Sequence, residues 1–169
     1  MWPGPAGAHN WQPMSWNPST QLMYFPFHDI PGYYNDKGIR HAEYQAKPLE
    51  LHTGVSFAEE DGDANDGTSG IMAWDPLQQE IAWQHPTPGV WNGGTMTTGG
   101  NLVFQGLADG RFLAYRADDG EIVWQYDAKH GIAAPPITFE TDGRQFIALP
   151  VGWGGGLAMA GGSLGAQHG

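Results

Sequence analysis

The sequence predicts an all-β fold of short antiparallel strands, and three observations support this prediction. Gly (26) and Pro (13) together exceed a fifth of the 169 residues, which favours a structure rich in turns. Strand-like segments follow one another at intervals of about 8–12 residues. A segment that ends at Trp83 recurs 41 positions later and ends at Trp124. A strand-rich repeat of this length, with one Trp per unit, is typical of a β-propeller blade.

The first 27 residues are expected to begin the propeller strands. Residues 1–10 are rich in Gly and Pro and are interpreted as a loop. Strands are predicted at residues 14–18 and 21–27. The turn between them contains Asn17 and Pro18, two residue types that favour turns for different reasons: local side-chain hydrogen bonding and a fixed φ.

Residues 28–68 are interpreted as a long loop excursion from the propeller. This stretch is polar, contains Gly and Pro, and shows neither helical nor strand periodicity. It ends in an acidic run at residues 59–66, whose closely spaced carboxylates raise the alternative of calcium binding. The run lacks the full spacing of an EF-hand loop, so a solvated loop is the preferred interpretation.

Residues 69–156 are expected to form propeller blades, and residues 157–169 a Gly-rich tail. The strands predicted here are residues 70–74, 81–85, 94–98, 102–106, 112–116, 122–126, 134–138 and 145–150. The connections between them carry Asp-Gly or Gly-Asn pairs, which accept the positive φ angles of tight hairpins. Strands joined in this way predict four-stranded antiparallel blades.

The Trp repeat has a physical explanation in blade packing. A small Ala lets neighbouring blades approach, a Gly permits the hairpin turn, and the final Trp spreads a large flat surface over the next blade. Gly120 occupies the turn position in the second copy, whereas Gln79 stands there in the first. Packing rather than catalysis is therefore the preferred role for Trp83 and Trp124.

Composition excludes several functions. The net charge of −11 and the seven scattered Lys and Arg residues disfavour a nucleic-acid partner, which needs basic side chains to neutralise phosphates. The absence of Cys excludes a disulfide framework, a thiolate metal site and a Cys-attached haem within these residues. The His residues show no pairing on one face, so no metal ligand is assigned.

Four segments resemble the C-terminal part of the propeller of pyrroloquinoline-quinone (PQQ) dependent alcohol dehydrogenases, especially the quinohaemoprotein type. They are residues 7–14 (GAHNWQPM), 91–98 (WNGGTMTT), the repeat ending at Trp124, and 151–155 (VGWGG). The resemblance leaves out only the excursion and the extreme C-terminus. It implies that the chain forms the last blades of an eight-bladed quinoprotein propeller that holds its cofactor near the axis.

The resemblance also implies an activity. Members of this family oxidise small alcohols to aldehydes with PQQ and calcium, usually in the periplasm, and pass electrons to a cytochrome c. The family's catalytic Asp, its calcium ligands, its Cys pair and its haem-binding Cys-x-x-Cys-His have no matching segment here. No catalytic residue is therefore assigned. The chain is expected to be a fragment, inactive without the remaining blades; the full-length protein could also carry haem c.

Four residues match positions that line the family's cofactor and substrate pocket. Asn10, Trp11 and Trp91 are the candidates for binding PQQ, and Trp153 is the candidate for the substrate pocket. A Gly pair after Trp91, at residues 93–94, is expected to let the backbone approach a flat ligand. The alternatives are structural: Asn10 caps a turn, Trp11 lies in the core, Trp91 packs against a blade, and Trp153 is exposed by a Gly-rich tail.

Two other functions remain open at this point. A non-enzymatic propeller used for binding or assembly would share the Trp repeats, although it would have no need for both Asn10-Trp11 and the segment at Trp91. A membrane-associated relative with its cytochrome on another subunit would also lack the haem motif.

Overall fold

The structure is a computed structural model, and it describes residues 1–4, 7–34, 55–56, 68–87 and 91–152. Regular structure in these ranges is entirely β. The strands are β1 (Ser15–Asn17), β2 (Leu22–Asp29), β3 (Tyr33–Tyr34), β4 (Val55–Ser56), β5 (Thr68–Asp75), β6 (Glu80–Thr87), β7 (Thr95–Thr98), β8 (Leu102–Gly106), β9 (Arg111–Arg116), β10 (Ile122–Asp127), β11 (Ile137–Thr141) and β12 (Arg144–Ala148). Within the same ranges no helix is long and apolar enough to cross a membrane.

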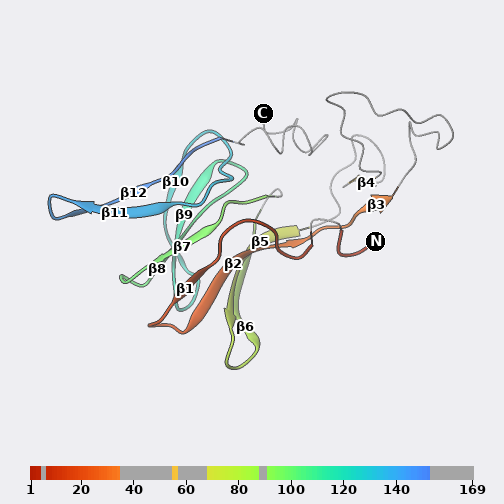
Figure 1. Cartoon of the computed structure of the whole chain (residues 1–169), viewed down its shortest axis with the longest axis horizontal. Coiled ribbons are helices and arrows are strands. Elements are labelled where there is room, and N and C mark those ends of the chain that lie inside the picture. Colours follow the sequence, from red (N-terminus) through yellow and green to blue (C-terminus); the bar gives the residue numbers. More distant parts are fainter. Residues whose placement is uncertain (5–6, 35–54, 57–67, 88–90, 153–169) are drawn as a thin grey trace.

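Eight of the strands form two four-stranded antiparallel sheets, which are propeller blades. Blade 1 has the order β1-β2-β5-β6, and blade 2 has the order β7-β8-β9-β10. The hairpin β11-β12 lies beside blade 2 (Figure 1), and β3 pairs with β4. The predicted partial β-propeller with four-stranded antiparallel blades is confirmed.

The two Trp repeats occupy the same place in their blades. Ala73 pairs with Trp83 and Ala114 pairs with Trp124, and each pairing lies next to a shift in register. Each repeat thus supplies the last two strands of one blade. Such a bulge bends the outer strand and increases its twist.

The turn between these strands has the same geometry in both copies. The N–H of Gln79 donates to the Asp75 carbonyl, and the N–H of Gly120 donates to the Arg116 carbonyl, each at 2.9 Å. Gln79 has a φ of 59° and Gly120 a φ of 77°, both in the left-handed region. Gln79 is exposed, whereas Gly120 is buried.

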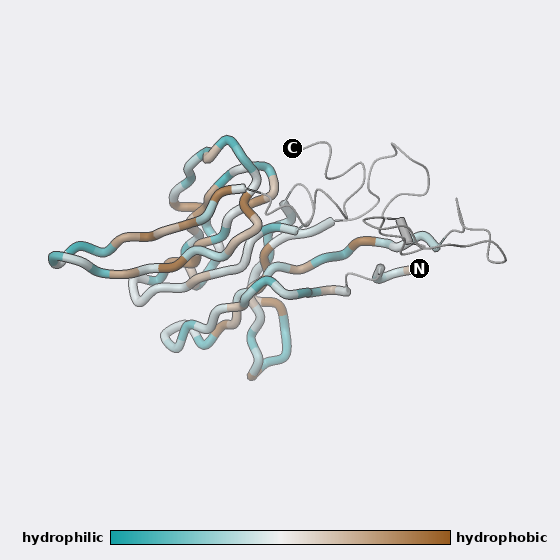
Figure 2. The backbone as a smooth tube through the Cα atoms, turned by 45° about the horizontal axis from the view of Figure 1, so that its top comes forward, coloured by the Kyte–Doolittle hydropathy of each residue, from teal (hydrophilic) through white to brown (hydrophobic). Residues whose placement is uncertain are grey.

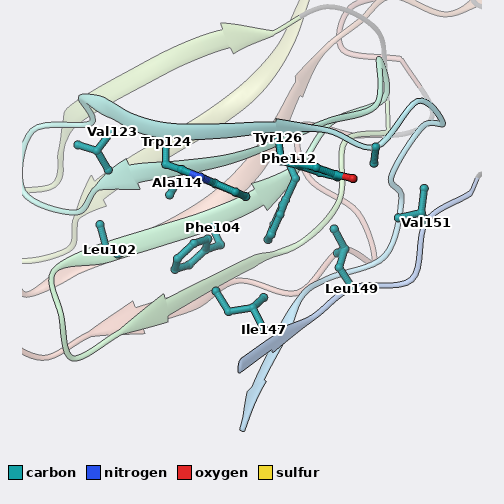
Figure 3. A pocket seen from close by; sticks show the side chains of 11 residues that line it. Leu102, Phe104, Phe112, Ala114, Val123, Trp124, Tyr126, Ile147, Leu149 and Val151 are labelled. Carbon is teal, nitrogen blue, oxygen red and sulfur yellow. The ribbon is translucent and has the colours of Figure 1, made fainter. Parts of the chain in front are cut away.

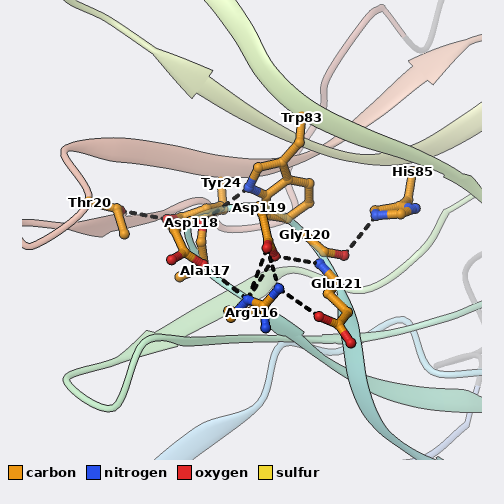
Figure 4. A network of polar contacts seen from close by, with 10 residues as sticks. All are labelled: Thr20, Tyr24, Trp83, His85, Arg116, Ala117, Asp118, Asp119, Gly120 and Glu121. Atoms are coloured by element: carbon orange, nitrogen blue, oxygen red, sulfur yellow. Dashed lines mark hydrogen bonds and ion pairs between the residues drawn. The ribbon is translucent and has the colours of Figure 1, made fainter.

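Trp83 joins blade 1 to blade 2. Its ring lies 5.7 Å from that of Tyr24 and 5.9 Å from that of Tyr115, and only 9% of the residue is exposed. Its Nε1 donates to the Ala117 carbonyl at 3.0 Å, which also accepts from the Tyr24 hydroxyl at 2.8 Å (Figure 4). Burial of an aromatic of this size contributes about 5 kcal/mol. The packing role predicted for Trp83 is confirmed.

Trp124 is placed differently, since 49% of it is exposed. It meets Phe112 edge to face at 5.9 Å and lies parallel to Tyr126 at 6.3 Å, both residues of blade 2 itself. The expectation that Trp124 is covered by a following blade is therefore wrong for the described part of the chain. Among the described residues the β11-β12 hairpin lies on that side (Figure 1), and its apolar residues Ile137 and Phe139 are exposed. The hairpin carries hydrophobic segments along its length (Figure 2).

An apolar cavity of about 560 Å³ lies between blade 2 and the end of the hairpin (Figure 3). Its lining residues are Leu102, Phe104, Phe112, Ala114, Val123, Trp124, Tyr126, Ala128, Ile147, Leu149 and Val151. Blade 2 supplies the residues from Leu102 to Tyr126, and Ile147, Leu149 and Val151 come from β12 and the chain that follows it.

Two details of the strand prediction are corrected. The strand expected at residues 134–138 begins at Ile137, because Pro135 and Pro136 have no N–H to donate to a ladder. β3 and β4 were not predicted. They lie between β2 and β5, which pair directly from Asp29↔Thr68 onward. The sequence between these two strands is thus an insertion within blade 1.

Candidate functional site

The N-terminal segment that contains Asn10 and Trp11 is attached to both blades. The Ala8 carbonyl accepts a hydrogen bond from the His28 N–H at 2.8 Å, at the end of β2. The Pro13 carbonyl accepts one from the Thr95 N–H at 2.9 Å, at the start of β7. Because one end is bound to blade 1 and the other to blade 2, the segment crosses the junction of the blades.

Asn10 and Trp11 lie at the surface of this junction. The Oδ1 of Asn10 accepts a hydrogen bond from the Trp11 N–H at 2.8 Å, which fixes the orientation of the Asn10 amide. Trp11 is 59% exposed. The alternative that Trp11 belongs to the core is therefore wrong, and its ring offers a flat apolar surface to a ligand.

Trp91 lies just before β7 and has an unusual backbone. Its φ is 64°, a conformation rarely adopted by bulky residues and typically held in place by the surrounding structure. The ring is half-buried and lies 5.3 Å from the ring of His28, at an interplanar angle of 55°. Trp91 therefore packs on the end of β2 rather than at the centre of a blade.

His28 links the two predicted cofactor segments. Its backbone N–H donates a hydrogen bond to the carbonyl of Ala8, two residues before Asn10, and its ring contacts the ring of Trp91. The side chain is buried, and neither ring nitrogen has a hydrogen-bond partner within the described residues. Burial, and to a smaller extent the nearby His9, lowers the pKa of His28 to about 4. The imidazole is therefore neutral at physiological pH.

Gln12 is a second buried polar group at this junction. It is 1% exposed, and both its amide oxygen and its amide nitrogen lack a partner in the described part of the chain. Buried polar groups without partners are rare in proteins and require an explanation, such as a bound molecule or a functional role. Gln12 follows the exposed Trp11 directly in the chain, so this buried amide lies close to the predicted cofactor segment.

The Gly pair after Trp91 has a different role from the one expected. A Cβ on Gly93 would lie 2.6 Å from the Ala134 carbonyl oxygen, and a Cβ on Gly94 would lie 2.6 Å from Cδ of Pro13. The interpretation that missing side chains open space for a ligand is wrong here. That space is filled by neighbouring protein, and the glycines allow close packing of the segments around β7.

Trp153 lies outside the described residues. The chain just before it is held in place, because the Gly152 N–H donates to the Gly131 carbonyl at 2.8 Å and Gly152 forms a bridge with Ile132. The carbonyl of Ile132 lies 3.2 Å from the Cβ position of Gly93. The segment leading to Trp153 thus runs close to the one that follows Trp91.

Sequence reasoning missed three residues of this junction: Gln12, His28 and Asn92. Asn92 is fully buried and hydrogen-bonded across the blades. Asn92 belongs to the Trp-Asn-Gly-Gly segment that suggested a site, whereas nothing in the sequence distinguishes the other two. No group of three or more potential metal-ligating His, Cys, Asp or Glu side chains occurs among the residues that the structure describes.

Comparisons with known proteins agree with the observed propeller blades. A family model for the PQQ-dependent "Glucose/ethanol/alcohol dehydrogenase, beta-propeller domain" matches residues 63–147. The "Quinohemoprotein alcohol dehydrogenase ADH IIB" of Pseudomonas putida is 47% identical over 163 residues, covering 96% of this chain and 23% of the relative. The "Alcohol dehydrogenase (quinone), dehydrogenase subunit" of Acetobacter aceti is 42% identical over 173 residues, covering 99% of this chain and 23% of the relative.

A solved structure agrees as well. The quinohemoprotein alcohol dehydrogenase ADHIIG of Pseudomonas putida HK5 superposes with a TM-score of 0.74 at 39% identity, covering 90% of this chain and 23% of that protein. The chain thus spans less than a quarter of the length of these three proteins.

Proposed function

Because the chain belongs to the family of PQQ-dependent alcohol dehydrogenases, we propose that its blade junction forms part of the wall of a PQQ pocket. The activity proposed for the protein is oxidation of alcohols to aldehydes. The observation that carries the proposal is the exposure of Trp11 next to a junction that also holds Trp91, with His28 joining their segments.

The side chains of the junction suit a planar ligand with polar edges. Trp11 and Trp91 offer flat surfaces on which a ring system stacks. The amide of Asn10 carries both a donor and an acceptor for the edge of a quinone. PQQ, when bound, supplies the acceptor for two electrons from the alcohol carbon. The residues of this chain orient the ring and exclude water from its faces.

The substrate pocket is assigned to Trp153 by the family resemblance alone. The catalytic base and the calcium ligands are proposed to lie on parts of the protein outside these 169 residues, since no matching segment occurs here. A bound calcium ion would polarise the quinone carbonyl as a Lewis acid.

The location, substrate and partners of the protein are proposed from the same family resemblance. We propose a periplasmic protein that uses small alcohols, passes electrons to a cytochrome c, and requires the remaining propeller blades. The name of the Acetobacter aceti relative describes a dehydrogenase subunit, which supports assembly with further subunits or domains. A haem c attached elsewhere in the protein is compatible with this proposal.

The experiment that tests the proposal is a PQQ titration of the apoprotein that carries this chain. We expect Trp11→Ala and Trp91→Ala each to raise the Kd for PQQ about tenfold, the loss expected when one stacked aromatic contact of about 1.4 kcal/mol is removed. Trp16→Ala is the matched control, because Trp16 is also an exposed Trp but lies on β1.

Two results would contradict the proposal. An unchanged Kd in both variants would remove these residues from the pocket. An absence of any PQQ binding would favour a propeller without a cofactor. The 169-residue polypeptide alone, supplied with PQQ and calcium, is expected to show no dye-linked alcohol oxidation.

A further inference from the structure

The backbone of Trp91 needs support from its neighbours. A bulky residue with a φ of 64° occupies a sparsely populated region and persists only where the surrounding structure over-determines it. The His28 ring contacts Trp91 on one side, but this contact constrains the side chain rather than the backbone. The next residue along the chain supplies the missing constraint.

The side-chain amide of Asn92, the residue after Trp91, forms hydrogen bonds through both its nitrogen and its oxygen. Its Nδ2 donates to the Ser69 hydroxyl at 3.1 Å and to the Thr87 hydroxyl at 2.6 Å. Its Oδ1 accepts from the Ala108 N–H at 2.9 Å. Both amide protons and the amide oxygen are thus used, and the residue is 0% exposed. Such a fully satisfied buried amide fixes its own backbone in one orientation.

The partners of Asn92 come from three separate elements. Ser69 lies on β5, Thr87 lies on β6, and Ala108 follows β8. Ser69 also pairs with His28 across β2-β5 and with Thr87 across β5-β6. The residue after Trp91 is therefore fastened to the same end of blade 1 that carries His28, and at the same time to blade 2.

The backbone after Asn92 is held as well. The Gly93 N–H donates to the Gly106 carbonyl at 2.8 Å, and the Gly93 carbonyl accepts from Nε2 of Gln105 at 3.0 Å. The backbone is thus held on the C-terminal side of Trp91, at Asn92 and Gly93.

We propose that Asn92 is a positioning residue that holds Trp91 in its left-handed conformation for contact with PQQ. This inference rests on the proposed function of Trp91 as a cofactor contact. Asn92 does not touch the cofactor. It acts by keeping the binding-competent orientation of Trp91 populated in the absence of ligand.

The test compares Asn92→Ala with Asn17→Ala in the apoprotein that carries this chain. Asn17 is also buried, and its Nδ2 bridges the blades by donating to the Thr97 hydroxyl at 3.1 Å. It lies away from Trp91, at the last residue of β1, where its Oδ1 accepts from the Ser19 N–H. Loss of either amide should lower the Tm. Only loss of Asn92 should weaken PQQ binding.

The expected size follows from the population of the competent conformer. If Trp91 adopts its native orientation one-tenth of the time once released, and the other orientations bind PQQ as weakly as Trp91→Ala does, the Kd for PQQ rises about fivefold. Asn17→Ala should leave the Kd within about twofold of the parent. In a Trp91→Ala background, Asn92→Ala should have no further effect on the Kd, because the side chain that it positions is gone.

Thr87→Val provides a milder second variant, since it removes one acceptor of the Asn92 amide with little change in volume. We expect a rise in Kd of about threefold, intermediate between the parent and Asn92→Ala. This variant keeps the inference testable if Asn92→Ala does not fold.

The outcomes separate this inference from the proposed function. If Trp91→Ala weakens PQQ binding but Asn92→Ala and Thr87→Val do not, Asn92 only fastens the blades and the inference is wrong. The same conclusion follows if Asn17→Ala weakens binding as much as Asn92→Ala. If Trp91→Ala itself leaves the Kd unchanged, Trp91 does not contact PQQ, and both its proposed function and the inference on Asn92 are wrong.

Discussion

Gly120→Ala tests the packing of Trp83 of blade 1 against Gly120 of blade 2. A Cβ at this position would lie 2.6 Å from Cδ2 and 2.7 Å from Cε3 of Trp83. The Trp83 ring has little freedom to move, because its Nε1 is bonded to the Ala117 carbonyl and its faces contact Tyr24 and Tyr115. Overpacking of such a site costs about 1–3 kcal/mol.

The backbone adds a second cost to the same substitution. Gly120 has a φ of 77°, and a residue with a Cβ in this region costs roughly 1–2 kcal/mol. The expected loss is therefore about 2–5 kcal/mol, a large part of the roughly 5–15 kcal/mol that stabilises a typical domain. With a urea m-value of about 2 kcal/mol per M, a loss of 3 kcal/mol lowers the unfolding midpoint by about 1.5 M.

Gly143→Ala is the matched control for the backbone cost. Gly143 has a φ of 70°, and a Cβ there would meet no atom within 4 Å. Urea unfolding followed by tryptophan fluorescence should show a loss of only about 1–2 kcal/mol for this variant. In a Trp83→Leu background, Gly120→Ala should cost no more than Gly143→Ala. Equal losses for the two Gly variants in the parent protein would refute the packing of Trp83 on Gly120.

Three further predictions concern buried polar groups. Tyr24→Phe should destabilise the protein by about 1 kcal/mol, because it removes a bond to the Ala117 carbonyl. Tyr115→Phe should be neutral or stabilising, since its buried hydroxyl has no partner among the described residues; thermal unfolding compares the two variants. The contribution of His28 to the free energy of unfolding should be fully present above pH 6.5 and should be lost as the pH falls toward 4. Between these values the unfolded state binds a proton at His28, whereas the folded state keeps the ring neutral. His28→Leu should reduce that slope in urea unfolding across this pH range.

The blade architecture could be predicted because it depends on local sequence patterns. The repeat ending at Trp83 and Trp124 gives the spacing of the outer strands, and Asp-Gly turns mark the hairpins. The equivalence of Gln79 and Gly120 followed from alignment of the two copies, and both adopt a positive φ. The exposure of Trp124 could not be predicted, because it depends on which elements stand beside blade 2 and not on the repeat itself.

The candidate site was only partly predictable. Residues such as Trp11 and Trp91 stand out by type and by resemblance. The importance of His28 and Gln12 comes from burial of their side chains without a hydrogen-bond partner among the described residues. Burial of this kind arises from contacts between distant segments. The role of the Gly pair at 93–94 was misjudged for the same reason, because the atoms that fill the space beside it belong to Ala134 and Pro13.

Hydrogen bonds join the two blades at several points and fix the shape of the candidate site before any ligand binds. At the inner strands the Ser15 and Thr95 hydroxyls lie 2.9 Å apart, and the Thr95 hydroxyl donates to the Tyr24 carbonyl. The Tyr24 hydroxyl and Asn92 bind blade 2 at separate points, through the carbonyl of Ala117 and the N–H of Ala108.

Three separate attachments leave little freedom for one blade to rotate on the other. The segment at Asn10 and Trp11 is bound to both blades, and Trp91 lies in the connection between them, so their relative positions are set by the fold before any ligand binds. Rigid positioning of this kind lowers the entropy lost on binding. The blade junction therefore contributes to ligand affinity as well as to stability, and substitutions at its different attachments should separate these two contributions.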